Sequence, residues 1–270
     1  RLVHNLSLPE KPVLGIISNL PLDTGAGGIL AAMRGQSQPF LIYAELTDRF
    51  NVEFIPPDSV KLPNNIDVLL LAHPRPLNDM QAYAVDQFIM RGGRVLAFLD
   101  PQSEVSLTAG PNGEPLKGYT EQSSLPKLLG RWGVQLDNNL IVADRKRAQR
   151  VAAGRDARRA LTDYILWMGL TSEEMNGDDL ITANIDHLNI GTVGALFATD
   201  NATTIFTPLV SSSDDASLMT RDYVLTAPSP DKLLRRFEPG DAPYVISARL
   251  SGLVTTAFPD GPPAGDNQNG

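Results

Sequence analysis

The sequence has no cysteine among its 270 residues. This absence excludes disulfides, thiolate metal sites and a cysteine nucleophile. It leaves the compartment open, because bacterial chains without cysteine occur in the cytoplasm and in the periplasm. Histidine is scarce as well, and His4, His73 and His187 form no pair with the spacing of metal ligands. The serine hydrolase motif Gly-x-Ser-x-Gly is also absent.

The sequence also lacks a long hydrophobic run. No stretch reaches the roughly 18–20 apolar residues that span a membrane. The start, "RLVHNLSLPEKP", has neither an initiator methionine nor the apolar core of a signal peptide. We therefore interpret the chain as an excised or processed piece of a longer protein. This sequence does not define the other parts of that protein. The end, residues 259–270, is rich in proline, glycine and asparagine and is predicted to be a disordered tail or linker.

Positive charge is in deficit. The formal net charge is −8 and the estimated pI is 4.9, which disfavours nucleic acid as a partner because phosphate binding needs clustered lysine and arginine. One basic run is the exception, and it comprises Arg145, Lys146, Arg147, Arg150, Arg155, Arg158 and Arg159. This run is either a solvated helix face or loop, or a patch for phosphate or anionic lipid.

The first half of the sequence alternates strand-like and helix-like segments. Apolar runs at 13–18, 51–57, 66–74 and 94–100 predict four strands. The nearly continuous apolar run at 66–74 is typical of a strand that is covered on both faces, as in a parallel sheet. Pro39 begins a predicted helix that runs to about Phe50. These features indicate an α/β fold with a mainly parallel sheet of flavodoxin or glutamine-amidotransferase type.

A second predicted helix lies between the third and fourth strands. Asn78 is the expected N-cap, with Gln81 closing a capping box. The spacing of the apolar residues predicts that Asp86 points away from the core. Gly92 and Gly93 end the helix, because glycine adopts the left-handed cap conformation at low cost. The segment is therefore a βαβ unit with a right-handed crossover.

The pattern changes at about residue 145. We predict a Rossmann-like α/β core over 1–145 and an α+β elaboration or smaller lobe over 146–258. Strands are expected within 138–144, 192–198, 203–210 and 244–258, and short helices at 124–133 and 229–237.

Polar residues follow three of the predicted strands. In an open parallel sheet, ligands bind beyond the carboxyl ends of the strands, where the strand order reverses. Asp100 could accept a hydroxyl or a cation, His73 could transfer a proton and Arg75 could hold an anion. The alternative is that the Asp-Pro and His-Pro sequences only end strands, because proline cannot donate to a ladder. The candidate ligand-binding residues are Ser18, Asn19, His73, Arg75 and Asp100.

Three further motifs leave a structural and a functional interpretation open. The "GAGG" sequence at 25–28 lacks the lysine and hydroxyl of a Walker loop, so the chain is not itself predicted to be an ATPase. The segment 176–187 contains Asp178, Asp179, Asp186 and His187, which form either a cation site or a solvated turn. Trp132 and Trp167 either stack on a sugar ring or pack in the core.

Four sequence segments, taken in their order along the chain, together resemble a known family. They are "KPVLGIISNLPL", "IDVLLLAHPRPLNDMQAYAVDQFIMRGGRVLAFLDP", "LLGRWGVQLDNNLIVAD" and "YVISARLSGLVTTAFPDGPP". Over about residues 11–260 they resemble the extracytoplasmic domain of GldG-like auxiliary components of ABC transporters, the gliding-motility-type family. The resemblance implies a membrane-anchored parent chain, with this domain on the periplasmic face of the bacterial inner membrane. It also implies a separate permease, a separate ATPase and a Rossmann-like sheet related to class I glutamine amidotransferases.

The resemblance carries over no catalytic residue. We therefore expect a non-catalytic domain of an ABC transport system that binds a partner protein or a ligand, such as a glycan or lipid-linked substrate, without a cofactor or metal. One alternative is a hydrolase acting on sugar or amide substrates through Asp100 and His73. Another is a sugar-binding module, in which exposed aromatic side chains line a cleft.

Overall fold

The computed structural model divides into two compact units. Unit 1 comprises 1–99, 105–128 and 256–270, and unit 2 comprises 100–104 and 129–255. The boundary passes through two short helices, α5 (Glu104–Thr108) and α6 (Pro126–Trp132). The residues described are 10–56, 58–108, 110, 114–115, 120–152, 161–200, 202–226 and 229–263. Within these ranges no helix has the length and apolar character needed to cross a bilayer.

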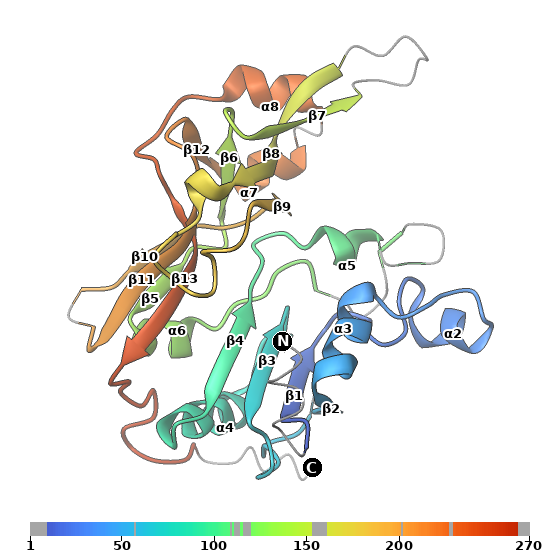
Figure 1. Ribbon diagram of the computed structural model, residues 1–270, viewed down its shortest axis with the longest axis vertical. Coiled ribbons are helices and arrows are strands. Elements are labelled where there is room, and N and C mark those ends of the chain that lie inside the picture. Colours follow the sequence, from blue (N-terminus) through green and yellow to red (C-terminus); the bar gives the residue numbers. More distant parts are fainter. Residues whose placement is uncertain are drawn as a thin grey trace, which may run out of the picture. The chain divides into compact units, whose positions relative to one another are not determined.

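Unit 1 is built on a four-stranded parallel sheet (Figure 1). The strand order is β2-β1-β3-β4, and all three pairings are parallel. The predicted strands and their side-by-side arrangement are thus confirmed. The strands are β1 (Val13–Ser18), β2 (Asn51–Phe54), β3 (Val68–Ala72) and β4 (Arg94–Phe98).

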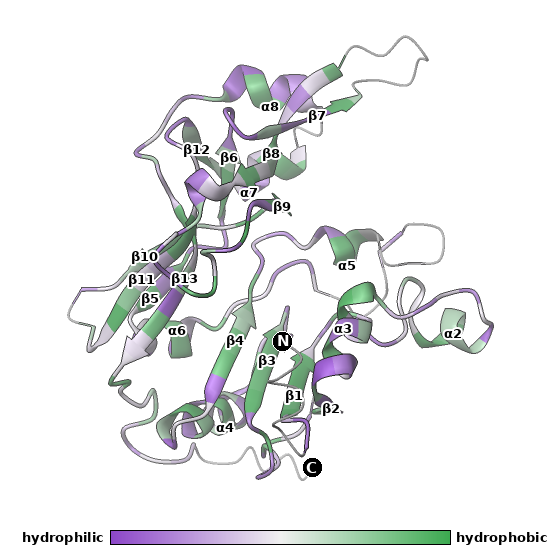
Figure 2. Cartoon of the chain, viewed as in Figure 1, coloured by the Kyte–Doolittle hydropathy of each residue, from purple (hydrophilic) through white to green (hydrophobic). Residues whose placement is uncertain are grey.

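Both faces of the central strands are buried. Leu14 and Ile16 of β1 pack with side chains of α3 (Leu41–Arg49), including Tyr43. Leu69 and Leu71 of β3 alternate to the opposite face and are fully buried. In the view of Figure 1, α4 lies at the lower end of β4, which it contacts. Covered faces on both sides explain the continuous apolar run of β3, which is hydrophobic along its length in Figure 2.

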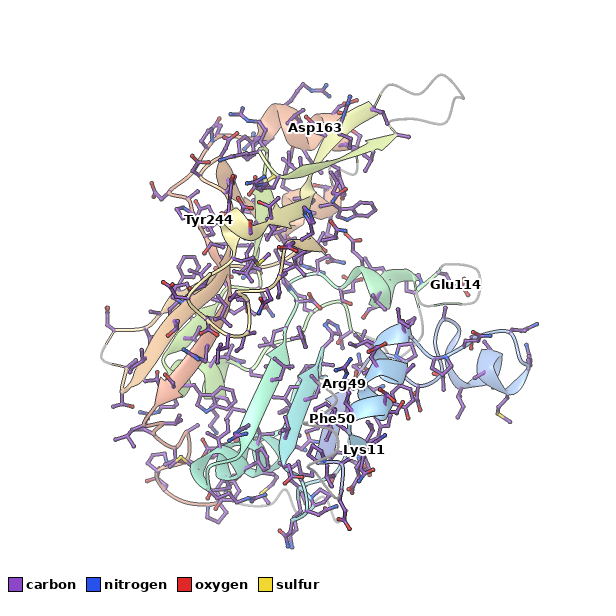
Figure 3. The ribbon with its side chains drawn as sticks, viewed as in Figure 1. Lys11, Arg49, Phe50, Glu114, Asp163 and Tyr244 are labelled. Carbon is purple, nitrogen blue, oxygen red and sulfur yellow. The ribbon has the colours of Figure 1, made fainter. Side chains whose placement is uncertain are left out.

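The connection from β1 to β2 contains α2 (Gly28–Met33) and α3. Gly25 in the glycine-rich loop has φ 73°, and an added Cβ would lie 1.8 Å from the carbonyl oxygen of Gln38. The loop is therefore a close-packed turn. In the last turn of α3, the carbonyl of Thr47 accepts a hydrogen bond from the Lys11 ammonium, near Arg49 (Figure 3). A cation at this end of a helix satisfies carbonyls that have no partner within the helix.

Helix α4 (Asp79–Met90) has the predicted capping box of Asn78 and Gln81, and Gly92 follows with φ 92°. The prediction that Asp86 points to solvent is wrong, because its side chain is fully buried. Its carboxylate accepts hydrogen bonds from the Thr256 hydroxyl at 2.5 Å and the Ala257 amide at 2.9 Å. The helical pattern could not reveal this, since the covering segment lies 170 residues away in sequence.

Unit 2 consists of antiparallel sheets with two helices at its C-terminal side. The sheet orders are β11-β13-β10-β5, β12-β6 and β7-β8-β9. The strands are β5 (Val134–Leu136), β6 (Leu140–Asp144), β7 (Ala148–Ala152), β8 (Leu161–Thr171), β9 (His187–Gly191), β10 (Leu196–Ala198), β11 (Thr204–Ser211), β12 (Ala216–Thr220) and β13 (Val245–Gly252). The helices are the 3-10 turn η1 (Ser172–Glu174), α7 (Arg221–Thr226) and α8 (Pro230–Arg236).

The long strand β8 organises the core of unit 2. Its Ile165 and Leu166 pack with Leu233 of α8, while Met168 and Leu170 belong to a second apolar cluster. The sequence prediction missed β8 and also β5, β7, β9 and β12, but it placed strands correctly at β6, β10, β11 and β13 and helices at α6 and α8. Exposed Trp167 lies between buried Leu166 and Met168, but all three side chains are apolar, so the alternation of burial has no counterpart in the sequence and the strand β8 was not recognised.

Candidate functional site

The strand ends of unit 1 meet at the position where the strand order reverses. Ser18 at the end of β1 pairs with Ala72 of β3, and Ala72 pairs with Phe98 of β4. Because β2 lies on one side of β1 and β3 on the other, the connections from β1 and β3 lead in opposite directions. In open α/β sheets, ligands bind in the crevice at such a switch point. Asn19 and His73 directly follow the last paired residues of β1 and β3, and the Asn19 amide donates to the His73 carbonyl.

His73 is held in a constrained and buried position. Its φ is 48°, which is uncommon for a residue other than glycine, and only 1% of its surface is exposed. Its ring Nε2 lies 2.9 Å from the carbonyl oxygen of Thr120. Since a carbonyl only accepts, Nε2 carries the proton and donates it. Backbone conformations of this kind concentrate at functional sites, and here the carbonyl of Thr120 fixes the orientation of the imidazole.

Asn19 links two other residues at this edge. The Arg75 Nε donates to the Asn19 side-chain oxygen at 2.7 Å, and the Asn19 amide donates to the Thr120 hydroxyl at 3.1 Å. Asn19 is 5% exposed, whereas Arg75 is exposed. The guanidinium is therefore oriented through Nε while its terminal nitrogens make no hydrogen bond to any described residue. A guanidinium held in this way can bind a carboxylate or phosphate through two parallel hydrogen bonds.

The structure brings together three of the five predicted residues: Asn19, His73 and Arg75. Ser18 instead closes a local turn, in which its hydroxyl accepts from the Leu20 amide at 2.9 Å. Asp100 begins the short segment 100–104, which belongs to unit 2.

Thr120 completes the network of unit 1, and sequence reasoning missed it. It lies 47 residues after His73 and follows a turn-rich loop, so no local pattern could associate it with the strand ends.

The first three residues of the basic run pair with acidic side chains of unit 2. Arg145 pairs with Asp215 at 2.8 Å, and Lys146 pairs with Asp214 at 3.1 Å. Arg147 contacts Glu173 and Glu174. These pairs favour the structural interpretation of Arg145–Arg147. Arg155, Arg158 and Arg159 lie outside the described residues.

The acidic segment 176–187 does not form a metal site among the residues that the structure describes, which contain no suitable group of three or more ligands. Asp179 is 5% exposed, and its carboxylate binds Arg249 at 2.9 Å. The structural interpretation is also favoured for Trp132, which is 6% exposed, but Trp167 is 40% exposed.

The ion pair of Glu174 and Arg147 predicts a pH dependence of stability. Burial raises the pKa of Glu174, but hydrogen bonds from the Thr171 amide, Arg147 and the Thr171 hydroxyl lower it, and the pKa lies below its usual value. A carboxyl with a lowered folded-state pKa stabilises the protein above its unfolded-state pKa, and this contribution is lost as the pH falls through the folded-state value.

We expect Glu174→Gln to lower the unfolding midpoint at neutral pH and to reduce the loss of stability below about pH 4.5. Urea unfolding at several pH values, followed by tryptophan fluorescence, measures this difference, since Trp132 and Trp167 both belong to unit 2. Parallel pH profiles for the variant and the wild type would contradict the assignment. Carboxylates that do not contact Arg147 contribute equally to both proteins.

Comparison with known proteins agrees with the resemblance seen in the sequence. The family model described as "ABC-type uncharacterized transport system" matches residues 11–270, a range that includes residues of both compact units. No curated protein and no solved structure matches the chain. The chain belongs to the family of auxiliary components of ABC-type transport systems.

Proposed function

We propose that the chain is a non-catalytic domain on the periplasmic face of the bacterial inner membrane, where it binds a partner protein or ligand of its ABC transport system. Its parent chain is membrane-anchored and works with a separate permease and a separate ATPase. Family membership supports association with an ABC-type transport system. The binding role rests on the exposed Arg75 guanidinium, which is oriented at the switch point of the sheet.

We further infer that unit 1 is Rossmann-like and flavodoxin-like and is related in shape to class I glutamine amidotransferases. Its order β2-β1-β3-β4 equals the first four positions of the flavodoxin order. The chain has no cysteine that could act as the nucleophile of such an amidotransferase. The buried imidazole of His73, with Nε2 bonded to Thr120, supports use of this fold for binding.

Exposed apolar side chains support contact with another protein. Five large apolar residues on α2 and at the start of α3 are more than half exposed, with Met33 at 80%. Single exposed apolar residues are ordinary, whereas five such residues within fifteen positions of the sequence support an apolar contact in this part of unit 1. The residues are Ile29, Leu30, Met33, Leu41 and Ile42.

A binding measurement on Arg75 tests this function. We expect Arg75→Ala to weaken retention of the full-length parent chain by detergent-solubilised permease–ATPase complex by about tenfold, because a charge-assisted, two-pronged contact is lost. Arg75→Lys should restore only part of the binding, since an ammonium cannot make parallel hydrogen bonds.

Arg94→Ala is the matched control, because Arg94 is also exposed, belongs to unit 1 and begins β4, at the opposite edge of the sheet from the strand ends. It removes the same charge away from the strand ends and should leave retention unchanged. Equal weakening by the two alanine variants would show a general charge effect. Unchanged retention with Arg75→Ala would remove Arg75 from the binding site.

A further inference from the structure

Unit 2 has a pocket of about 340 Å³ on the sheet of β7, β8 and β9. Its lining includes Gln149 from β7, Trp167 from β8, and Asn189 and Gly191 from β9, together with Glu104. The volume is at the lower end of the roughly 300–1,000 Å³ range of small-molecule sites. No lysine or arginine occurs among the described residues that line it, and Glu104 is acidic, so the pocket does not suit an anion.

Trp167 is exposed but fixed in orientation. Its indole Nε1 donates to the Glu104 carboxylate at 2.7 Å, and the ring of Tyr164 packs edge-on at a centroid distance of 5.2 Å. The side chain nevertheless keeps 40% of its surface exposed. An indole that packs in a core is buried, as Trp132 is, whereas a fixed and exposed indole provides a rigid apolar surface for a ligand.

Two glycines leave room for the pocket side chains. Gly191 pairs with Trp167 across β8 and β9, and a Cβ at Gly191 would come within 2.8 Å of the indole Cδ1. A Cβ at Gly169 would likewise come within 2.8 Å of the Gln149 amide nitrogen. The indole and the amide can therefore lie close to the backbone of the sheet, which a larger residue at either position would prevent.

The polar groups of the pocket offer both donors and acceptors. Gln149 donates from Nε2 to the Asn189 side-chain oxygen at 2.9 Å. The Gln149 oxygen and the Asn189 amide nitrogen make no further hydrogen bond to the described residues. Together with the Glu104 carboxylate, they suit a ligand with several hydroxyls, each of which donates and accepts.

The backbone next to the pocket is strained. Thr192 has φ 48°, which is rare for a β-branched residue, and it is 4% exposed. Its hydroxyl contacts the Gln102 carbonyl oxygen at 3.0 Å and the Glu104 carboxylate at 3.3 Å. The strained residue thus helps to place the carboxylate beside the indole. Strain of this kind, which costs about 1–3 kcal/mol, is concentrated at ligand sites.

We propose that this pocket binds a neutral saccharide. The apolar C–H face of one pyranose ring stacks on the indole of Trp167, and its hydroxyls bond to Gln149, Asn189 and Glu104. A fixed aromatic surface edged by amides and a carboxylate matches the alternating apolar and hydroxyl character of a sugar. The proposal gives the ligand-binding part of the proposed function a site, but it stands on unit 2 alone and does not depend on Arg75.

Tryptophan fluorescence of the whole chain tests the proposal. Trp132→Phe leaves Trp167 as the sole tryptophan, and this variant is titrated with maltotriose, cellotriose, mannotriose and triacetylchitotriose. At least one saccharide should produce a saturable change in emission. In isothermal titration, Trp167→Ala should weaken binding of that saccharide by about tenfold or more, while Trp132→Phe leaves it unchanged.

Asn189→Ala keeps the indole and provides a second test, since Asn189 is exposed and its replacement does not disturb the core. It should weaken binding by about fivefold through loss of a hydrogen bond. Three results contradict the proposal. They are no binding of any of the four saccharides up to their solubility limits, saccharide binding that Trp167→Ala leaves unchanged, and binding of the cation tetramethylammonium in place of every saccharide. Saccharide binding together with unaltered permease retention in Arg75→Ala would disprove the strand-end contact and leave this site standing.

Discussion

Replacing Asp86 with alanine is expected to lower the free energy of unfolding of unit 1 by about 3 kcal/mol or more. The carboxylate is fully buried and accepts hydrogen bonds from the Thr256 hydroxyl and the Ala257 amide. Its removal leaves the amide of Ala257 buried without an acceptor. A hydrogen bond to a charged group contributes about 1.5–3 kcal/mol, and leaving a buried donor unsatisfied adds a penalty.

Hydrogen exchange and urea unfolding measure the effect. The amide of Ala257 should lose its protection in Asp86→Ala, while the unfolding transition seen by far-UV circular dichroism shifts to lower urea. Asp86→Asn keeps an acceptor oxygen and should retain part of the stability. Asp48→Ala, an exposed carboxylate on α3, serves as the control and should change stability by less than about 0.5 kcal/mol. Full protection of Ala257 in Asp86→Ala would refute the assigned role.

Asp144→Ala should destabilise unit 2 by a similar amount, about 3 kcal/mol or more. Asp144 ends β6 and is fully buried. It accepts from the Ser213 amide at 2.7 Å, the Ser213 hydroxyl at 2.8 Å and the Arg147 amide at 2.9 Å. One carboxylate therefore fixes the turn before β12 and the turn before β7, so alanine leaves two backbone donors without partners.

The tryptophans report this change directly, because both belong to unit 2. Urea unfolding followed by fluorescence should show a lower midpoint for Asp144→Ala and an intermediate one for Asp144→Asn. Asp214→Ala is the matched control, since Asp214 is near in sequence to Ser213 but forms an exposed pair with Lys146. Its midpoint should equal that of the wild type. Equal midpoints for Asp144→Ala and Asp214→Ala would contradict the assignment.

Local sequence signals were sufficient to predict the parallel sheet of unit 1 and its helix α4. The capping box of Asn78 and Gln81, the glycine at 92 and the apolar run of β3 each define an element without reference to distant residues. Once the strands are assigned as parallel, their carboxyl ends must lie at one edge. That step is what brought Asn19 and Arg75 together in the prediction.

Other features depend on contacts between distant parts of the chain. Asp86 looked solvent-exposed because helical periodicity does not include a covering segment 170 residues later. Thr120 was missed for the same reason. In unit 2, β8 pairs with β7 through an irregular register, and its exposed Trp167 is as apolar as the buried Leu166 and Met168 on either side, so the sequence shows no alternation. The exposed indole of Trp167 could not be distinguished from Trp132 by sequence, since both have aliphatic neighbours.

The discontinuity of unit 1 has a consequence for biosynthesis. Residues 256–258 supply the partners and covering of a helix that was translated about 170 residues earlier, whereas unit 2 is continuous apart from 100–104. A ribosome therefore releases everything that unit 2 requires before it releases the last piece of unit 1. Domains commonly fold in order from the N-terminus during synthesis. In this chain unit 2 is free to mature first, whereas α4 of unit 1 gains the partners of Asp86 only after residues 256–258 have been translated.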